Sequence, residues 1–340
     1  MTRLFGWRAL LLLLICVSAS AQPAPSPHPV RLSADAFEGD ARVEVRDLPE
    51  EAAEAAARAA LEEVLRIERL LDPRAAEPEP GGVAALNAKA GQGPQPVSRP
   101  LLAFLGRTLD FCSWSQRANG PLGGRLFDAW GLHRPVEARP AAQALLDASA
   151  SAGCAHLRLD REAGTATLDA GSRLDLWPFA TGWAVDRALE IVREHGAGNA
   201  YAEVNEVRRG LGPGPDGRGW RVWLPVFPGY RQSLGSVWLK DKALAIAHYE
   251  DRLLEIAGDP VVPYWSQRTG RPAEGLVAVI AVSELGVDAR SLASTMFITG
   301  HLKGQFLLGQ LRPAPSVRWL LGTGEGRPLL ADFNWMELRR

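Results

Sequence analysis

The histidines and cysteines, with which a protein most often binds a metal or attacks a substrate, are scattered along this sequence. His133, His156, His195, His248 and His301 each stand alone, and there is no HExxH and no paired CxxC. Zinc sites need such close spacings, because several ligands must reach one ion. We therefore expect structural histidines and no metal site built from histidine and cysteine.

Glycine-rich stretches offer a second route to chemistry, through backbone contacts with phosphates. Gly81-Gly82, Gly123-Gly124 and 210–219 are of this kind, but none has the GxGxxG pattern between a strand and a helix. No GxSxG is present, which argues against a nucleophilic serine elbow. These general motifs assign no catalytic residue.

A series of short phrases in a fixed order is more informative than any single motif. Leu174-Asp175-Leu176 is followed by ATGWAVDR at 180–187, and ARSLASTMF at 289–297 is followed by Gly300. Further phrases stand in the same order at 67–68, 85–87, 130–131, 219–225, 243–245 and 268–272. Over about 60–330 the series resembles the FAD:protein FMN transferases, the ApbE-like family.

This resemblance implies an α+β fold, with mixed or antiparallel sheets and packed helices, and a magnesium-dependent reaction. Members of that family cleave FAD and place FMN on a serine or threonine of an exported acceptor protein. FAD is then the implied ligand, and exported flavin-carrying redox proteins are the implied partners. Carried over position by position, the resemblance implies these ligand-binding residues: Asp175, Thr181, Gly182, Thr269, Gly270, Arg290 and Ser294.

Most positions that would carry this chemistry hold other residues here. The metal-binding aspartate of the family falls on Arg290, its threonine partner on Ser294 and its lysine on Thr181. Two family glycines fall on Trp177 and Pro178. Other polar or glycine positions of the family fall on 205–207, 246–248, Pro263 and Ser266. An arginine cannot ligate a cation and would repel one, so we expect no magnesium site and a lost or weakened reaction.

Arg290 has two interpretations. Its guanidinium could replace the metal and hold a phosphate directly, because its planar fork suits oxyanions. Alternatively it pairs with a nearby acid such as Glu206 or Asp288 and fills the former metal position. We favour the second interpretation.

Several other residues also allow both a functional and a structural interpretation. Asp175 and Asp186 could shape a phosphate pocket, but we expect them to cap a helix end or to form a surface ion pair. Thr269-Gly270 is most simply a turn. Six tryptophans could stack on a flavin, although at strand and helix positions we expect them in the core: Trp177, Trp183, Trp220, Trp223, Trp238 and Trp265.

The periodicity of apolar residues predicts the elements that must position these side chains. Strands are expected at 41–46, 156–160, 165–168, 200–204, 219–225, 235–240, 243–248, 276–282 and 316–321. Helices are expected at about 49–71, 98–114, 180–195, 288–300 and 302–310, with a helix or loop at 136–150. The sum is a mixed α+β protein.

The first 21 residues predict export. Arg3 and Arg8 precede an apolar run at 9–17, and Ala19-Ser20-Ala21 offers a signal-peptidase site. The run is too short to span a bilayer, which disfavours an uncleaved anchor. Ile15 before Cys16 disfavours a lipoprotein. We therefore expect a signal peptide over 1–21 cleaved near Ala21, a flexible lead-in over 22–35, a transferase-like domain over 36–340, and a periplasmic or secreted location.

Cleavage would remove two arginines and no acidic residue, so the net charge would change from −1 to −3. This excludes a basic nucleic-acid binder, and no second apolar span of membrane length follows the signal. Cys112 and Cys154 would remain. They could form a disulfide in an oxidising compartment, or they could be two buried thiols.

Three functions stay open at this point. The first, which we favour, is a periplasmic binding or accessory protein that keeps the scaffold without the catalysis. The second is an active FAD:protein FMN transferase with an altered site, and the third is a module that binds flavin non-covalently. No SGAT-like acceptor sequence occurs, so we do not expect this chain to carry a covalent flavin itself.

Overall fold

The computed structural model describes residues 28–340, apart from 228–229, 231–232, 251–252, 324–327 and 336–340. Its main element is an eight-stranded sheet in the order β1-β2-β6-β7-β10-β13-β14-β15, in which neighbouring strands are antiparallel. In that order the strands span Val30–Ala36, Gly39–Val45, Ala200–Val204, Val207–Leu211, Lys242–His248, Leu276–Ser283, Ser316–Leu321 and Leu329–Phe333. The sheet and its helices confirm the expected α+β class.

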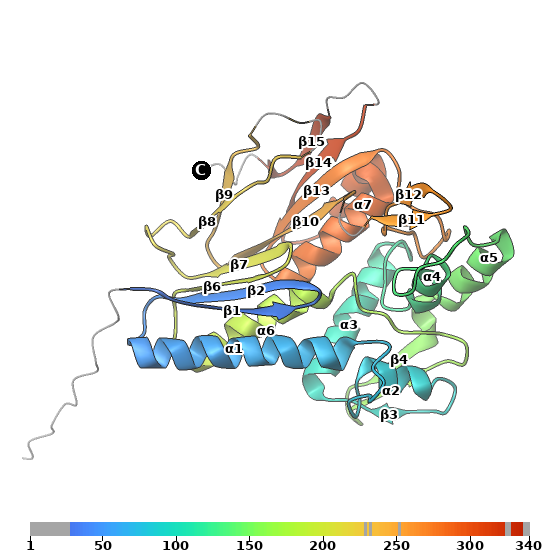
Figure 1. The fold of residues 1–340 in the computed structure, drawn as a ribbon, viewed down its shortest axis with the longest axis horizontal. Coiled ribbons are helices and arrows are strands. Elements are labelled where there is room, and N and C mark those ends of the chain that lie inside the picture. The colour runs from blue at the N-terminus through green and yellow to red at the C-terminus, as the bar shows by residue number, and fades with distance from the viewer. Residues whose placement is uncertain (1–27, 228–229, 231–232, 251–252, 324–327, 336–340) are drawn as a thin grey trace, which may run out of the picture.

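Three long helices cover one face of this sheet (Figure 1). They are α1 (Glu50–Leu71), α6 (Ala180–Glu194) and α7 (Gly286–Leu308). The strands alternate, so that every second side chain faces the helices in the larger hydrophobic core. Gly300 inside α7 has a non-helical backbone, with φ of 73° and ψ of 172°, so α7 consists of two helices that meet at a kink, as expected from 288–300 and 302–310. Within the described ranges, no helix is long and apolar enough to cross a bilayer.

The opposite face of the sheet carries an antiparallel pair, β8 (Trp220–Trp223) and β9 (Ser236–Leu239). Trp220 and Val222 point from this pair toward the sheet, where they pack with residues such as Ile280 in a second core. The sheet is therefore buried on both sides where these layers cover it.

The chain between α1 and α6 forms a second group of elements beside the sheet (Figure 1). They are α2 (Val83–Ala88), β3 (Gln95–Pro96), α3 (Arg99–Trp114), α4 (Gly124–Ala129), α5 (Ala142–Ser151), the 3-10 helix η1 (Cys154–His156), β4 (Leu157–Asp160) and β5 (Thr165–Leu168). A later pair, β11 (Leu254–Ile256) and β12 (Asp259–Val261), packs against α4 and α5. Cys112 and Cys154 form a disulfide that joins α3 to η1, with a Cα–Cα distance of 6.0 Å.

The flexible lead-in predicted over 22–35 is wrong from residue 30 onward. Strand β1 pairs with β2 along its whole length, from Val30 opposite Val45 to Ala36 opposite Gly39. Val30, Leu32 and Ala34 pack against the main core, so their burial orders a segment that follows a proline-rich run. The folded domain therefore includes residues before 36. The predicted signal peptide over 1–21 lies outside the described residues.

Candidate functional site

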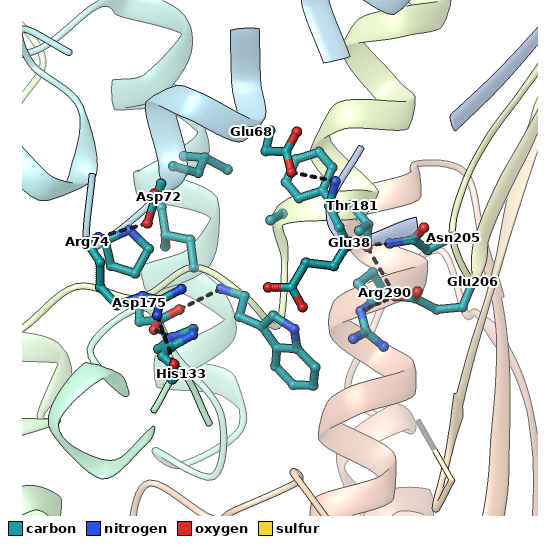
Figure 2. Close-up of a pocket in the computed structure, with 16 residues that line it drawn as sticks. Glu38, Glu68, Asp72, Arg74, His133, Asp175, Thr181, Asn205, Glu206 and Arg290 are labelled. Carbon is teal, nitrogen blue, oxygen red and sulfur yellow. Dashed lines mark hydrogen bonds and ion pairs between the residues drawn. The ribbon is translucent and has the colours of Figure 1, made fainter. Parts of the chain in front are cut away.

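A cavity of about 530 Å³ lies where distant parts of the chain meet. Its walls come from the β1–β2 turn, the end of α1, the start of α6, the β6–β7 turn and α7 (Figure 2). The lining residues are Phe37, Glu38, Glu68, Leu71, Asp72, Pro73, Arg74, His133, Asp175, Leu176, Trp177, Ala180, Thr181, Asn205, Glu206 and Arg290.

Arg290 reaches this cavity from α7 and is 3% exposed. Its Nε lies 2.9 Å from Oε1 of Glu206, and the pair is held by charge, since its geometry falls short of a hydrogen bond. The guanidinium carbon lies 5.2 Å from the centre of the Trp177 ring, and Nη1 donates to the Tyr264 hydroxyl at 3.4 Å. Thr181 donates its hydroxyl to the same Glu206 oxygen at 3.2 Å. Figure 2 shows Thr181, Glu206 and Arg290 on one side of the cavity.

The β1–β2 turn forms another wall and has an unusual backbone. Phe37 and Glu38 both have left-handed φ angles, 55° and 61°, which side chains with a Cβ rarely adopt. Two contacts hold the turn: the Phe37 N–H donates to Glu68 at 2.6 Å, and the Asn205 amide donates to the Phe37 carbonyl at 3.0 Å. Gly39 permits this approach, because a Cβ there would lie 2.2 Å from Oδ1 of Asn205. The turn is thus fixed at the mouth of the cavity.

Asp175 and His133 form a buried pair on the other side of the cavity (Figure 2). His133 Nε2 lies 2.5 Å from Oδ2 of Asp175, and the other carboxylate oxygen accepts the N–H of Trp177 at 3.0 Å. The second contact fixes the chain where it turns into α6. Asp175 therefore holds the local backbone, in the manner expected of a residue that caps a turn.

The groups around Arg290 do not fit a divalent cation. Magnesium needs several oxygen ligands in near-octahedral geometry, but Glu206 is engaged by the guanidinium. Ser294, one turn further along α7, has a buried hydroxyl without a hydrogen-bond partner. In the part of the chain that the structure describes, no group of three or more His, Cys, Asp or Glu residues is placed to hold a metal ion.

The charge of the cavity is also unsuited to a pyrophosphate without a metal. Two arginines line it, Arg74 and Arg290, against five carboxylates: Glu38, Glu68, Asp72, Asp175 and Glu206. Like charges in a partly buried site repel more strongly than in water. An anionic ligand would therefore meet unfavourable charge unless its phosphates stayed outside the cavity.

The structure brings only some of the predicted site residues together. Asp175, Thr181 and Arg290 line the cavity, and the expected pairing of Arg290 with Glu206 is present. The alternative partner, Asp288, instead pairs with Arg107.

Gly182 and Ser294 lie on α6 and α7 but do not line the cavity. Gly182 allows these helices to touch, since a Cβ there would lie 2.4 Å from the carbonyl oxygen of Gly286.

Thr269 and Gly270 form a turn that is not part of the cavity wall. Gly270 has φ of 71°, packs against Leu145 and Ser149 of α5, and accepts the indole N–H of Trp130 at 2.9 Å. The turn interpretation is therefore confirmed for these two residues.

Asp186 caps a helix, as the sequence suggested, but inside the protein rather than on its surface. Its carboxylate accepts the N–H groups of Gly286 and Val287 at the start of α7, at 2.7 and 2.9 Å, and pairs with Arg209 at 2.7 Å. Burial raises the pKa of Asp186 to about 6, although Arg209 and the two N–H groups act in the opposite direction.

The six tryptophans do not form one stacking platform. Trp183, Trp220 and Trp265 are buried in three different cores, as expected for core residues. Trp177 lines the cavity under Arg290. Trp223 is 62% exposed on β8 and Trp238 is only half-buried on β9, outside the three cores, so the expectation of a core position is wrong for these two residues.

The β1–β2 turn was not predicted to be part of the site. The alternation of apolar residues on both sides of Phe37-Glu38 was the available signal for a hairpin. Nothing local indicates that this hairpin lies beside residues 205 and 290, because that proximity arises from the order of strands in the sheet.

The eight-stranded sheet with α1, α6 and α7 on one face, and the cavity beside α7, agree with the α+β fold that the sequence resemblance implied. Residues 38–317 match the model of the ApbE family. A FAD:protein FMN transferase of Treponema pallidum (strain Nichols) is 30% identical over 279 residues, which cover 74% of each chain. The chain belongs to the ApbE family.

Solved structures agree on the fold. The ApbE protein of Thermotoga maritima superposes with a TM-score of 0.81 at 20% identity, over 92% of this chain and all of that one. The flavin transferase ApbE of Vibrio cholerae gives 0.78 at 18% identity, over 91% and 98% of the two chains. The flavinyl transferase ApbE of Pseudomonas stutzeri, in its apo form, also gives 0.78 at 18% identity, over 93% and 97%.

Proposed function

We propose that this chain is an exported ApbE-family protein whose magnesium-dependent flavin transfer is lost or severely weakened, and that it acts outside the cytoplasm as a binding or accessory protein. The observation that carries the proposal is the position of Arg290. A buried cation that is paired with Glu206 and packed on Trp177 leaves no acidic ligand for a metal on this part of α7.

The chemistry of the family reaction explains why an arginine at position 290 matters. Cleaving a pyrophosphate needs positive charge that stabilises the oxygens as negative charge develops on them. An arginine can supply such charge, but the guanidinium of Arg290 already has a carboxylate beside it. Its charge is therefore largely neutralised before any phosphate arrives.

We infer a flavin ligand from family membership together with the lining of the cavity. FAD or FMN is the ligand that family membership favours, and Trp177 offers an apolar surface within a space of about 530 Å³. The acidic lining favours contact with the uncharged flavin ring over contact with the phosphates. The partners would be exported flavin-carrying redox proteins, which agrees with the apolar run and the small residues at 9–21.

An active transferase is the second candidate, and one observation favours it. The Treponema pallidum relative at 30% identity is a FAD:protein FMN transferase. In that case Arg290 and Arg74 would have to neutralise the pyrophosphate in place of magnesium.

A transfer assay with a binding arm separates these candidates. The chain from Gln22 onward is mixed with FAD, Mg²⁺ and an acceptor domain that an active ApbE enzyme modifies, and flavin fluorescence on the denatured acceptor is measured. We expect less than about 1% of the labelling rate of the active enzyme, and saturable flavin binding by calorimetry. Labelling at a comparable rate would contradict the proposal, and the absence of both labelling and flavin binding would contradict the flavin ligand.

A further inference from the structure

The outer face of the β8–β9 pair carries an ordered row of aromatic and cationic side chains. The alternation along β8 points Trp220 and Val222 into the second core and leaves Arg221 and Trp223 exposed. Across the pair, Arg221 lies opposite Trp238. This face lies on the side of the sheet opposite α6 and α7 (Figure 1).

The side chains in this row stack on one another. The guanidinium carbon of Arg218 lies 4.1 Å from the centre of the Trp238 ring, and that of Arg221 lies 4.0 Å from Trp223 and 5.6 Å from Trp238. Arg221 also donates from Nε to the Ser236 hydroxyl at 3.0 Å. Stacking on an indole orders a guanidinium while its N–H edges stay available to an oxyanion. We call Arg218, Arg221, Trp223 and Trp238 the hairpin patch, and the exposed Val226 follows Trp223 along the chain.

The two arginines of the hairpin patch have no acidic partner among the described residues. The acids nearest to them in sequence, Asp216 and Asp241, form no ion pair with either arginine, and Asp241 accepts the N–H of Gly212 instead. Other arginines of the sheet are paired, such as Arg208 with Glu203 and Arg209 with Asp186. The patch therefore presents two ordered positive charges without internal compensation.

The same patch exposes apolar surface. Trp223 is 62% exposed and Val226 is 67% exposed, and the intervening Pro225 is exposed as well. Apolar residues that are scattered singly over a protein surface need no explanation, but exposed apolar residues that lie together beside cations indicate an interaction surface.

We propose that the hairpin patch docks this protein onto a membrane surface rich in anionic phospholipid. The bilayer interface stabilises all three kinds of side chain at once: indoles at the level of the headgroups, guanidiniums at the phosphates, and small apolar residues in the outer acyl region. Each cation near such a surface strengthens binding about fivefold, so the two arginines together contribute about 25-fold. Docking here would leave the cavity on the helix side of the sheet open.

Vesicle co-sedimentation tests this proposal. The chain from Gln22 onward, which contains every described residue but lacks the apolar run at 9–17, is mixed with vesicles of phosphatidylcholine alone or with one third phosphatidylglycerol. We expect binding only to the anionic vesicles, and weaker binding at 0.5 M salt. Arg221→Gln combined with Trp223→Ala should reduce the affinity at least tenfold.

A matched control removes one arginine and one aromatic residue elsewhere. Arg58 on α1 is exposed, and Phe306 on α7 is 66% exposed, so Arg58→Gln with Phe306→Ala makes the same change in charge and also replaces an exposed aromatic residue by alanine. This variant should bind anionic vesicles like the parent chain. Far-ultraviolet circular dichroism verifies that both variants fold, as expected for exposed positions. Equal binding to both vesicle types, no binding to either, or equal losses in the two variants would overturn the proposal.

Discussion

The pairing of Arg290 with Glu206 gives a charge balance that needs no metal. Arg290 stands where the family resemblance placed a metal-binding aspartate, and its pairing with Glu206 was predictable because an arginine in a buried site requires an acid. The two groups lie on different elements, α7 and the β6–β7 turn. Their interaction therefore also helps to hold these elements together.

Replacing Arg290 by alanine should destabilise the protein strongly. The substitution would leave Glu206, which is 21% exposed, without its cation, and we expect a loss of about 3 kcal/mol in the free energy of unfolding. Adding Glu206→Gln should restore part of that loss, with a coupling of at least about 1 kcal/mol in a double-mutant cycle from urea unfolding. Arg58→Ala, in an exposed pair with Glu54, is the control and should cost less than about 1 kcal/mol. Additive effects of the Arg290 and Glu206 substitutions would contradict the pairing.

Asp186 should make stability depend on pH in the direction opposite to a usual ion pair. The pKa of its carboxyl is raised from 3.8 to about 6, so between these values the folded state binds more protons than the unfolded state. The free energy of unfolding therefore falls as the pH rises from about 4 to 6, by about 3 kcal/mol from this group, and stays lower above that window. Urea unfolding at pH 4 and pH 7 measures the change. Asp186→Asn should lack this contribution, and an identical pH dependence in both proteins would refute the assignment.

At the scale of elements, Gly182 allows α6 and α7 to make close contact. The family resemblance suggested a ligand contact, but a Cβ at Gly182 would lie 2.4 Å from the Gly286 carbonyl oxygen and 2.7 Å from the Val287 Cα. Since the carboxylate of Asp186 caps α7 at the same place, the start of α7 is fixed on α6 by backbone contacts. This contact positions Arg290 one turn later.

Gly182→Ala should therefore destabilise the protein by about 1–3 kcal/mol, because overpacking forces the two helices apart. Gly309 at the end of α7 provides the control: it has right-handed helical angles, and a Cβ there would meet its nearest atoms at 3.5 Å. Gly309→Ala should be neutral or slightly stabilising. Thermal unfolding of both variants measures the difference, and equal midpoints would show that the helices do not need this glycine.

Most elements could be predicted from the sequence, and the misses have physical reasons. Strong periodicity located α3, α6, β10 and β13 within two residues. Strand β1 was missed because a proline-rich run precedes it, although Val30, Leu32 and Ala34 alternate. β7, with the sequence VRRGL, was missed because arginines occupy positions where apolar residues mark a strand. The cavity could be predicted only in part, since the β1–β2 turn reaches it through long-range strand pairing.

At the scale of the whole molecule, the disulfide and the sheet that is covered on both faces hold the scaffold together. The disulfide joins two segments 42 residues apart, and Cys112 is fully buried. A covalent link of that kind agrees with the predicted export, because disulfides persist in oxidising compartments. The sequence left this pairing open, since spacing alone does not bring two cysteines together.

Removing the disulfide should lower the free energy of unfolding by about 4 kcal/mol, because the unfolded chain regains the freedom of a loop of that length. Urea unfolding of a variant with Cys112→Ser and Cys154→Ser measures the loss. The parent chain unfolded in the presence of a reductant should show a similar shift. A loss below about 1 kcal/mol would mean that the link contributes little to the scaffold.

The most direct test of the central claim is a magnesium titration followed by calorimetry, with the parent chain and with Arg290→Asp, each in the presence of FAD. We expect no saturable Mg²⁺ binding by the parent chain up to about 10 mM, which is about ten times the dissociation constant of weak oxygen-ligand sites. We expect measurable binding by Arg290→Asp, because the substitution removes the cation and adds a carboxylate near Glu206 and Ser294. Saturable magnesium binding by the parent chain would contradict the claim that a guanidinium has taken the place of the metal.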